Sequence, residues 1–230
     1  MTDLAATQQS TSPSGEAPVY ATNAWGVFAG ICLIYLFFNW YLQTQVLTDE
    51  VYHYSLGGRV GADKLAAFLD GQHRMRFFSY LLVPVSLLVR MTLVSFCLLT
   101  GLLLTSRKLP FRDLFRIVLF AESAFAASTL LKLLLLAFSR NIDSVSQFES
   151  FAPLSLFSLV KASSVPLWLA YPLQTLDVFL LLYFGLLAAG LRYFLRLPFR
   201  NALLLVLGSY GTGLLCWMIG LAFLTVSFNP

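Results

Sequence analysis

The stretch FFSYLLVPVSLLVRMTLVSFCLLTGLLLT, residues 77–105, decides the fold class of this chain. It is apolar apart from scattered hydroxyl groups and a single charged side chain, Arg90. A run of this length exceeds the ~20 residues that an α-helix needs to cross the hydrocarbon core of a bilayer. It therefore predicts a transmembrane helix long enough to tilt, with Pro84 kinking it near one end.

Four further apolar runs follow the same pattern. The predicted spans are 25–42, 77–105, 114–138, 173–194 and 202–227. Trp25 begins the first span, and Trp40 and Tyr41 lie at its other end, as aromatic residues do at membrane interfaces. We therefore expect an all-α fold, namely a polytopic membrane helix bundle of about five transmembrane helices with short interfacial helices.

The composition agrees with a lipid-facing exterior. Hydrophobic residues make up 58% of the chain and charged residues 11%, whereas a soluble domain carries roughly 25% charge. The Lys and Arg residues flank apolar runs and do not cover one face, which excludes a nucleic-acid-binding surface. The expected partners are the lipid bilayer and other membrane proteins or further copies of this chain, and no nucleic acid.

The chain divides into a tail and one membrane domain. Residues 1–23 are rich in Ser, Thr, Ala, Gln and Pro and contain no Lys or Arg, which predicts a disordered N-terminal tail. A basic region and a cleavage site of a signal peptide are absent from it, so the first span should stay as an anchor. Residues 24–230 form the predicted transmembrane domain.

Two longer segments separate the spans. Residues 43–76 end in a helix-like piece, ADKLAAFLDGQHRMRF, which begins at Ala62. Residues 140–172 include FAPLSLFSLVKASSVPLWLAYP, which its three prolines break too often for it to span. We expect this second segment to form a short amphipathic or re-entrant piece at the interface. No repeat of the inverted kind found in transporters is visible.

The orientation follows from the short connections. Both are densely basic, whereas the two longer segments are balanced in charge; the basic residues are Arg107, Lys108, Arg112, Arg116, Arg192, Arg196 and Arg200. Short loops rich in Lys and Arg stay in the cytoplasm. We therefore expect a multi-pass protein of a bacterial inner membrane, with its N-terminus cytoplasmic and its C-terminus periplasmic or external.

Four ionisable residues lie inside the predicted spans: Arg90, Glu122, Lys132 and Asp177. An intramembrane charge costs a few kcal/mol even on lenient scales, so it normally pairs with an opposite charge or lines a polar path. Depths estimated at ~1.5 Å per helical residue place Arg90 about 8 Å deeper than Glu122, a gap that the long Arg side chain can largely cover. They place Lys132 and Asp177 both in the outer third. We therefore predict two intramembrane pairs, Arg90 with Glu122 and Lys132 with Asp177.

These pairs allow two functions. Structural clips are favoured by the small residues of ESAFAAST around Glu122 and of GLLAAG ending at Gly190, which permit close helix approach. GSYGTG at 208–213 is a further small-residue patch that could kink the fifth span. A scaffold or accessory subunit of a membrane-protein assembly would use the charges in this way. Alternatively, a small transporter or channel would use the four residues to carry protons or a charged solute.

Catalytic and metal sites find little support in the sequence. Cys32, Cys97 and Cys216 each sit alone in an apolar run, and His53 and His73 lack a third ligand. HExxH and GxSxG motifs are absent, and no His–Asp pair falls within a span. We expect no catalytic residues, no metal site and no cofactor, and hence a protein that is not an enzyme.

The C-terminal part resembles a known family. Residues 154–218 include LSLFSL, then TLDVF at the beginning of a span, and then the basic connection GLRYFLRLPFRNAL. This stretch is similar to the C-terminal half of bacterial members of the Yip family, the five-span membrane proteins of the Rab-GTPase-interacting type. The resemblance implies five spans, a cytoplasmic N-terminus and an external C-terminus. Eukaryotic members act in vesicle formation and membrane shaping through protein partners, and bacterial members lack an established activity.

Overall fold

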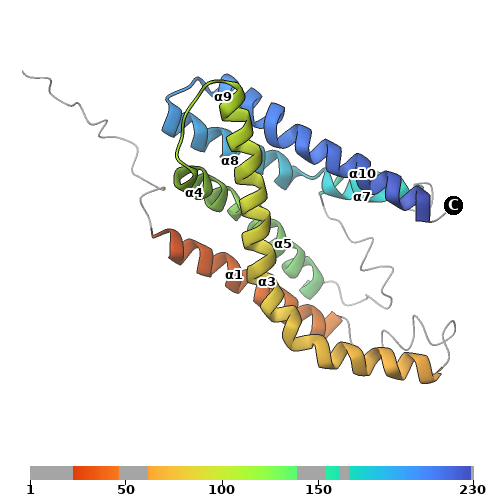
Figure 1. Ribbon diagram of the computed structural model, residues 1–230. Coiled ribbons are helices and arrows are strands. Elements are labelled where there is room, and N and C mark those ends of the chain that lie inside the picture. Colours follow the sequence, from red (N-terminus) through yellow and green to blue (C-terminus); the bar gives the residue numbers. More distant parts are fainter. Residues whose placement is uncertain (1–22, 47–61, 139–153, 161–165, 229–230) are drawn as a thin grey trace, which may run out of the picture.

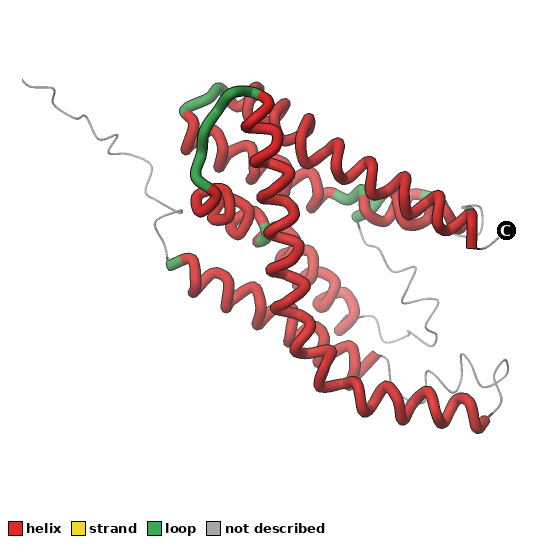
Figure 2. The backbone as a smooth tube through the Cα atoms, viewed as in Figure 1, coloured by secondary structure: helices red, strands yellow, loops and turns green. Residues whose placement is uncertain are grey.

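The computed structural model describes residues 23–46, 62–138, 154–160 and 166–228. Within these ranges every extended regular element is a helix, which confirms the expected all-α bundle (Figures 1 and 2). Five helical segments are long and apolar enough to cross a membrane: Ala24–Val46, Arg74–Leu104, Phe111–Phe138, Val178–Leu195 and Phe199–Phe228. The chain thus has the architecture of a multi-pass membrane protein.

The first three segments contain α1 (Ala24–Tyr41) with the π-helical turn η2 (Leu42–Val46), α3 (Ala62–Leu104), and α4 (Phe111–Ala121) with α5 (Ser123–Phe138). The last two contain α8 (Val178–Leu195), and α9 (Phe199–Val206) with the π-helical turn η5 (Leu207–Gly211) and α10 (Thr212–Phe228). The short 3-10 helix η3 (Leu156–Leu159) and α7 (Leu167–Thr175) precede α8. Residues 1–22 of the expected tail, and 47–61, 139–153 and 161–165 of the longer segments, lie outside the described residues.

The helix that contains the second span begins twelve residues before it, at Ala62. The helix-like piece that starts at Ala62 is not separate from the span, because α3 runs without interruption to Leu104. Pro84 lies inside this helix, and Figure 1 shows α3 bent between its N-terminal part and the remainder. A proline removes one backbone hydrogen bond and its ring clashes with the preceding turn, so it bends a helix without ending it.

The fourth span is shorter than expected. The prediction of 173–194 was wrong at its beginning, because residues up to Thr175 belong to the separate helix α7 and α8 begins at Val178. Leu176 leaves the helical region, and Asp177 adopts an extended conformation (φ −123°, ψ 170°) as the N-cap of α8. Backbone bonds from Leu156 N to Leu176 O (3.0 Å) and from Val178 N to Leu154 O (3.3 Å) hold an isolated bridge across this break.

Two short turns join the antiparallel neighbours α3–α4 and α8–α9. At the first, the N–H of Arg107 donates to the carbonyl of Leu102 (2.9 Å) and that of Ser106 to Leu103 (3.1 Å), which is the Schellman pattern of a helix end. Ser106 (φ 53°) and, at the second turn, Arg196 (φ 52°) both adopt the left-handed conformation that such an end requires.

Each turn then continues with the same four residues. Leu-Pro-Phe-Arg occupies 109–112 and again 197–200, and the proline is the N-cap of α4 in one case and of α9 in the other. A proline is well suited to a helix start, because its fixed φ is compatible with the helix and the N–H it lacks is not needed there.

The two turns lie at the same end of the bundle. Near its C-terminal end α3 packs against α9 and η5, and near its C-terminal end α8 packs against α4. In addition, α1 packs along α5 and α7 packs along α10. The hairpin of α3 with α4–α5 is therefore repeated by the hairpin of α8 with α9–α10, with both turns facing the same way. This is a parallel arrangement of two similar units, which differs from the inverted repeats considered for the sequence.

Two glycines sit at corresponding places where the units meet. A Cβ at Gly101 would lie 2.5 Å from Ser209 Cβ, and Leu205 is its next neighbour; a Cβ at Gly190 would clash with Ile117. Leu205 and Ile117 occupy the same position, six residues after the Phe of each Leu-Pro-Phe-Arg motif. The bare backbones of α3 and α8 thus allow each unit to approach the other closely.

The glycine contact predicts a strong positional difference along α8. Gly190→Ala should lower the stability of the protein by about 1–3 kcal/mol, because the methyl group overpacks against Ile117. Gly185→Ala on the same helix is the control, since a Cβ there meets nothing within 4 Å, and alanine should be neutral or slightly stabilising. Thermal unfolding of the purified variants in detergent measures both. Equal midpoints for the two variants would contradict the close approach.

Candidate functional site

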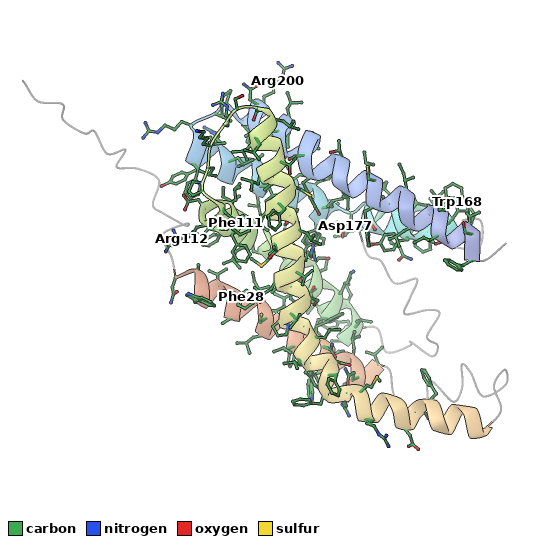
Figure 3. The ribbon with its side chains drawn as sticks, viewed as in Figure 1. Phe28, Phe111, Arg112, Trp168, Asp177 and Arg200 are labelled. Carbon is green, nitrogen blue, oxygen red and sulfur yellow. The ribbon has the colours of Figure 1, made fainter. Side chains whose placement is uncertain are left out.

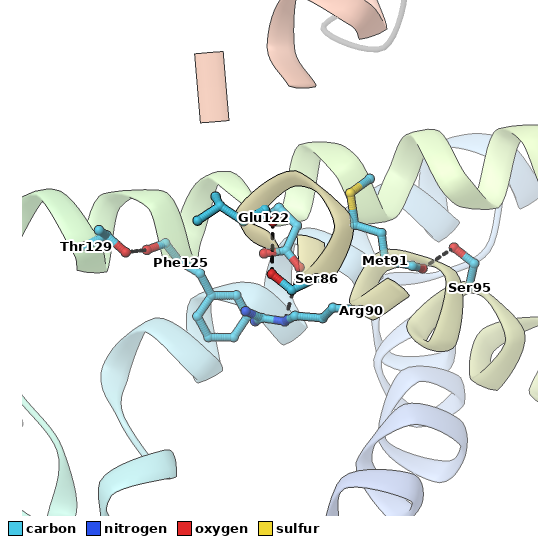
Figure 4. A network of polar contacts seen from close by, with 8 residues as sticks. Ser86, Arg90, Met91, Ser95, Glu122, Phe125 and Thr129 are labelled. Atoms are coloured by element: carbon cyan, nitrogen blue, oxygen red, sulfur yellow. Dashed lines mark hydrogen bonds and ion pairs between the residues drawn. The ribbon is translucent and has the colours of Figure 1, made fainter. Parts of the chain in front are cut away.

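An ion pair occupies the middle of the bundle. Arg90 lies near the centre of the membrane-spanning part of α3, and Glu122 lies at the single-residue interruption between α4 and α5. Arg90 Nε is 3.3 Å from Glu122 Oε1, as Figure 4 shows from close by. The Glu122 side chain is fully buried, whereas 40% of the Arg90 side chain is exposed. The structure therefore brings together the first of the two predicted pairs.

Glu122 interrupts its helix without breaking the backbone hydrogen bonds. Its N–H donates to the carbonyl of Val118 (2.9 Å), and its own carbonyl accepts from the N–H of Ala126 (3.0 Å). The carboxylate is thus carried on a helical backbone that continues from α4 into α5. Its direction is fixed, and it faces the side of α3 that carries Arg90.

An aromatic ring packs against the guanidinium, and two further rings follow it. Arg90 Cζ lies 4.1 Å from the centroid of the Phe125 ring, a cation–π contact. Phe125 in turn contacts Tyr183 of α8 (centroids 4.7 Å apart), and Tyr183 contacts Tyr210 of η5 edge-on (5.6 Å). From α1, the Tyr35 hydroxyl faces the side chains of Arg90 and Thr129. The pair therefore joins helices from both units in one cluster.

The cluster leaves hydrogen-bonding capacity unused. Within the described part of the chain, no protein group donates a hydrogen bond to either carboxylate oxygen of Glu122, and the Tyr183 hydroxyl has no partner. The 3.3 Å contact with Arg90 is thus an ion pair by distance but lacks the geometry of a hydrogen bond. Its attraction is mainly coulombic, and such attraction is much stronger at low dielectric than in water.

The second predicted pair is not formed. Among the described residues, Lys132 and Asp177 make no ion pair with each other. Asp177 lies outside the fourth span, where its Oδ1 accepts from the N–H of Leu180 (2.6 Å) and caps α8 (Figure 3). An aspartate that precedes an apolar run can be the N-cap of a helix as well as an intramembrane charge. The expected span began too early for Asp177 to be placed at its N-cap. Lys132 lies half-buried on α5.

Cysteines and histidines add no further site to the described chain. Cys32, Cys97 and Cys216 are free thiols in three different spans. Among the described residues, no three or more His, Cys, Asp or Glu side chains come together in a way that could hold a metal ion. His53 lies outside these residues, and the backbone of His73 is part of α3.

Four members of the cluster were not predicted from the sequence: Tyr35, Phe125, Tyr183 and Tyr210. Phenylalanines and tyrosines are frequent throughout this chain, so their identity alone does not distinguish a site from lipid-facing surface. A usable signal was the presence of tyrosine hydroxyls well inside spans, since a buried hydroxyl requires a partner.

Comparisons with known proteins add no identity. No protein-family model, no curated protein and no solved structure matches the chain. The resemblance to the Yip family therefore stays a prediction.

The ion pair predicts a specific pattern of stability. Glu122→Gln leaves the Arg90 charge inside the membrane without its counter-charge and should cost about 3 kcal/mol. Replacing both residues, as Arg90→Met with Glu122→Gln, should recover much of this loss, because no charge then remains uncompensated. Thermal unfolding in one detergent measures the complete double-mutant cycle.

Lys132→Met provides the matched control, because it removes an intramembrane cation that forms no ion pair among the described residues. It should leave the unfolding midpoint nearly unchanged. Additive effects of the two single substitutions at Arg90 and Glu122 would show that the pair is energetically unimportant.

Proposed function

We propose that this protein is an integral membrane scaffold or accessory subunit of a membrane-protein assembly, and not an enzyme. The proposal depends on the ion pair between Glu122 and Arg90. Through this pair, the buried carboxylate of Glu122 holds α4–α5 against α3. Such a pair fixes the rotation of one helix against another. It acts as a structural clip in a rigid bundle that presents its outside to lipid and to other proteins.

The layer between the pair and the basic turns supports a closed bundle. Fully buried apolar side chains from α3, α4 and α8 fill it; they are Leu98, Leu102, Leu114, Ile117, Val118, Leu187 and Leu191. A solute crossing the protein would have to pass through this layer. Its packing therefore favours a scaffold over a channel.

The outer surface offers extensive apolar area. Phe96 on α3 is 53% exposed and Trp217 on α10 is 61% exposed, and many further large apolar side chains of the spans are exposed as well. Surfaces of this kind fit the lipid bilayer, other membrane helices or a second copy of the chain. The family resemblance favours the same class of role, because eukaryotic Yip proteins act through protein partners.

The distribution of basic residues supports the orientation that we propose. Arg112 and Arg200 lie at the end of the molecule where the two short turns are found (Figure 3), and the remaining basic residues of the turns accompany them. By the positive-inside rule this end belongs in the cytoplasm of a bacterial inner membrane, with the N-terminus on the same side and the C-terminus outside.

A small proton or solute transporter is the second candidate. It is favoured by the exposure of Arg90 near the centre of a span and by the unused hydrogen-bonding capacity of Glu122. Buried ionisable groups in membranes often serve such pathways. In this case Glu122 and Arg90 would act directly on the solute, while Lys132 would line its route and Asp177 would lie outside the span.

Photocrosslinking distinguishes the two candidates. A benzophenone amino acid placed at Phe96, Trp217 or Phe223, all exposed, should give discrete protein adducts in native membranes at some of these positions. A scaffold makes specific contacts, so the adducts should cluster on one side of the bundle. The purified chain in liposomes should show no more proton or solute flux than empty vesicles.

The opposite outcome would support transport. Adducts with lipid alone at every exposed position, together with a flux that Glu122→Gln abolishes in a folded variant, would contradict the scaffold proposal. Elution of the variant as a single species in detergent provides the check of folding.

A further inference from the structure

Polar side chains continue from Glu122 along one face of α5. Thr129 follows Glu122 by seven residues, a spacing that returns to the same face of a helix, and Lys132 follows Thr129 by three residues, one turn farther along. Thr129 is buried and Lys132 is half-buried, so both side chains are at least partly covered by the protein. At ~1.5 Å per residue, this polar face extends about 15 Å from the carboxylate away from the basic turns.

A matching polar face lies on α1. Tyr35, Asn39 and Gln43 recur every four residues, each is half-buried, and the Gln43 side-chain amide donates to the Asn39 side-chain carbonyl. Helix α1 packs along α5, and Figure 1 shows both helices running in the same direction. Because the Tyr35 hydroxyl faces Thr129, the two polar faces begin side by side at that level.

We call Tyr35, Asn39, Gln43, Thr129 and Lys132 the polar seam. A hydrophobic span would normally place aliphatic side chains where two helices pack, since polar groups without partners are costly there. The Lys132 ammonium makes no ion pair among the described residues, and an unsolvated cation inside a membrane costs several kcal/mol. These features together indicate that the seam is hydrated.

The seam ends at groups that water would satisfy. Both Glu122 oxygens and the Tyr183 hydroxyl are buried without a hydrogen bond from the described protein, and Arg90 is 40% exposed beside them. Buried polar groups in native proteins are normally satisfied by the protein or by ordered water. Beyond this point, towards the basic turns, the apolar layer around Leu114 and Leu187 offers no polar group to continue the path.

We propose that water enters the bundle along the polar seam and hydrates Glu122 from one side only, the side opposite the basic turns. A hydronium ion arriving there gives its proton to a Glu122 oxygen and leaves a water molecule, and the reverse step returns the proton to the same side. Arg90 from α3 is in direct contact with Glu122, and the other titratable groups that interact electrostatically with it are Tyr35 from α1, Tyr183 from α8 and Tyr210 from η5. Lys132 lies farther along α5. Such access does not depend on a scaffold role.

Cysteine accessibility tests the seam. In a background with Cys32, Cys97 and Cys216 replaced by alanine, Thr129→Cys and Asn39→Cys should react with a charged, membrane-impermeant methanethiosulfonate. The reaction should occur from one side of sealed membrane vesicles. Leu130→Cys is the control, because Leu130 is 46% exposed and a cysteine there should meet lipid in place of water. A rate at least tenfold higher for Thr129→Cys than for Leu130→Cys is expected.

A second marker assigns the side. Ser106→Cys lies in a basic turn and should react from the face opposite to Thr129→Cys. Equal, low reactivity of Thr129→Cys and Leu130→Cys would overturn the proposal of a hydrated seam. Reaction of Thr129→Cys from the same face as Ser106→Cys, or from both faces, would overturn one-sided access.

Hydroxyl-radical labelling of the unmodified chain in nanodiscs avoids any effect of substitution on folding. Radicals form from water, so Tyr35 in a hydrated seam should be oxidised several times faster than Phe37, which is 51% exposed on the lipid-facing side of the same helix. Oxidation of Tyr35 at or below the level of Phe37, after correction for the intrinsic reactivity of each ring, would show that the seam is dry.

Discussion

The need to compensate a charge inside the membrane constrains the whole bundle. Glu122 is fully buried inside a membrane-spanning helix, so its carboxylate must be balanced within a few ångströms. Arg90 alone among the described cations does this. Once the two groups meet, the rotation of α3 about its axis and the height of α4–α5 beside it are both fixed. The aromatic contacts from Phe125 through Tyr183 to Tyr210 then extend that constraint to the second unit.

The end of the bundle that carries the basic turns depends on a different constraint, which is space. The Leu-Pro-Phe-Arg turns reverse the chain within a few residues, so α4 and α9 return close beside α3 and α8. Two such tight hairpins pack against each other only where side chains are missing, and Gly101 and Gly190 provide those places. In lipid, where no hydrophobic effect drives helices together, close backbone contact of this kind contributes much of the association.

A feature of this structure could be predicted from the sequence where a strong physical constraint determines it. The spans were predictable because length and hydropathy are set by the bilayer, and the Arg90–Glu122 contact was predictable because depth can be counted along a helix. Asp177 was misplaced, since hydropathy does not sense the break between Thr175 and Val178. The two parallel units were not predicted, because the main similarity between their sequences is the four residues that each turn shares. Their resemblance lies in how their helices pack.

The two ends of the molecule therefore differ in their packing and polarity. This difference links the stability of the bundle to the access of water to Glu122. Glycine contacts and an apolar layer close the end with the basic turns, whereas the polar seam between α1 and α5 extends from Glu122 towards the other end. A proton reaching Glu122 would remove the negative charge that holds Arg90, and the coulombic attraction between α3 and α4–α5 would be lost. The close packing at the basic end does not involve that charge and would persist. A change in protonation would therefore loosen the helices mainly on the seam side, where a partner protein or the bilayer would meet an altered surface.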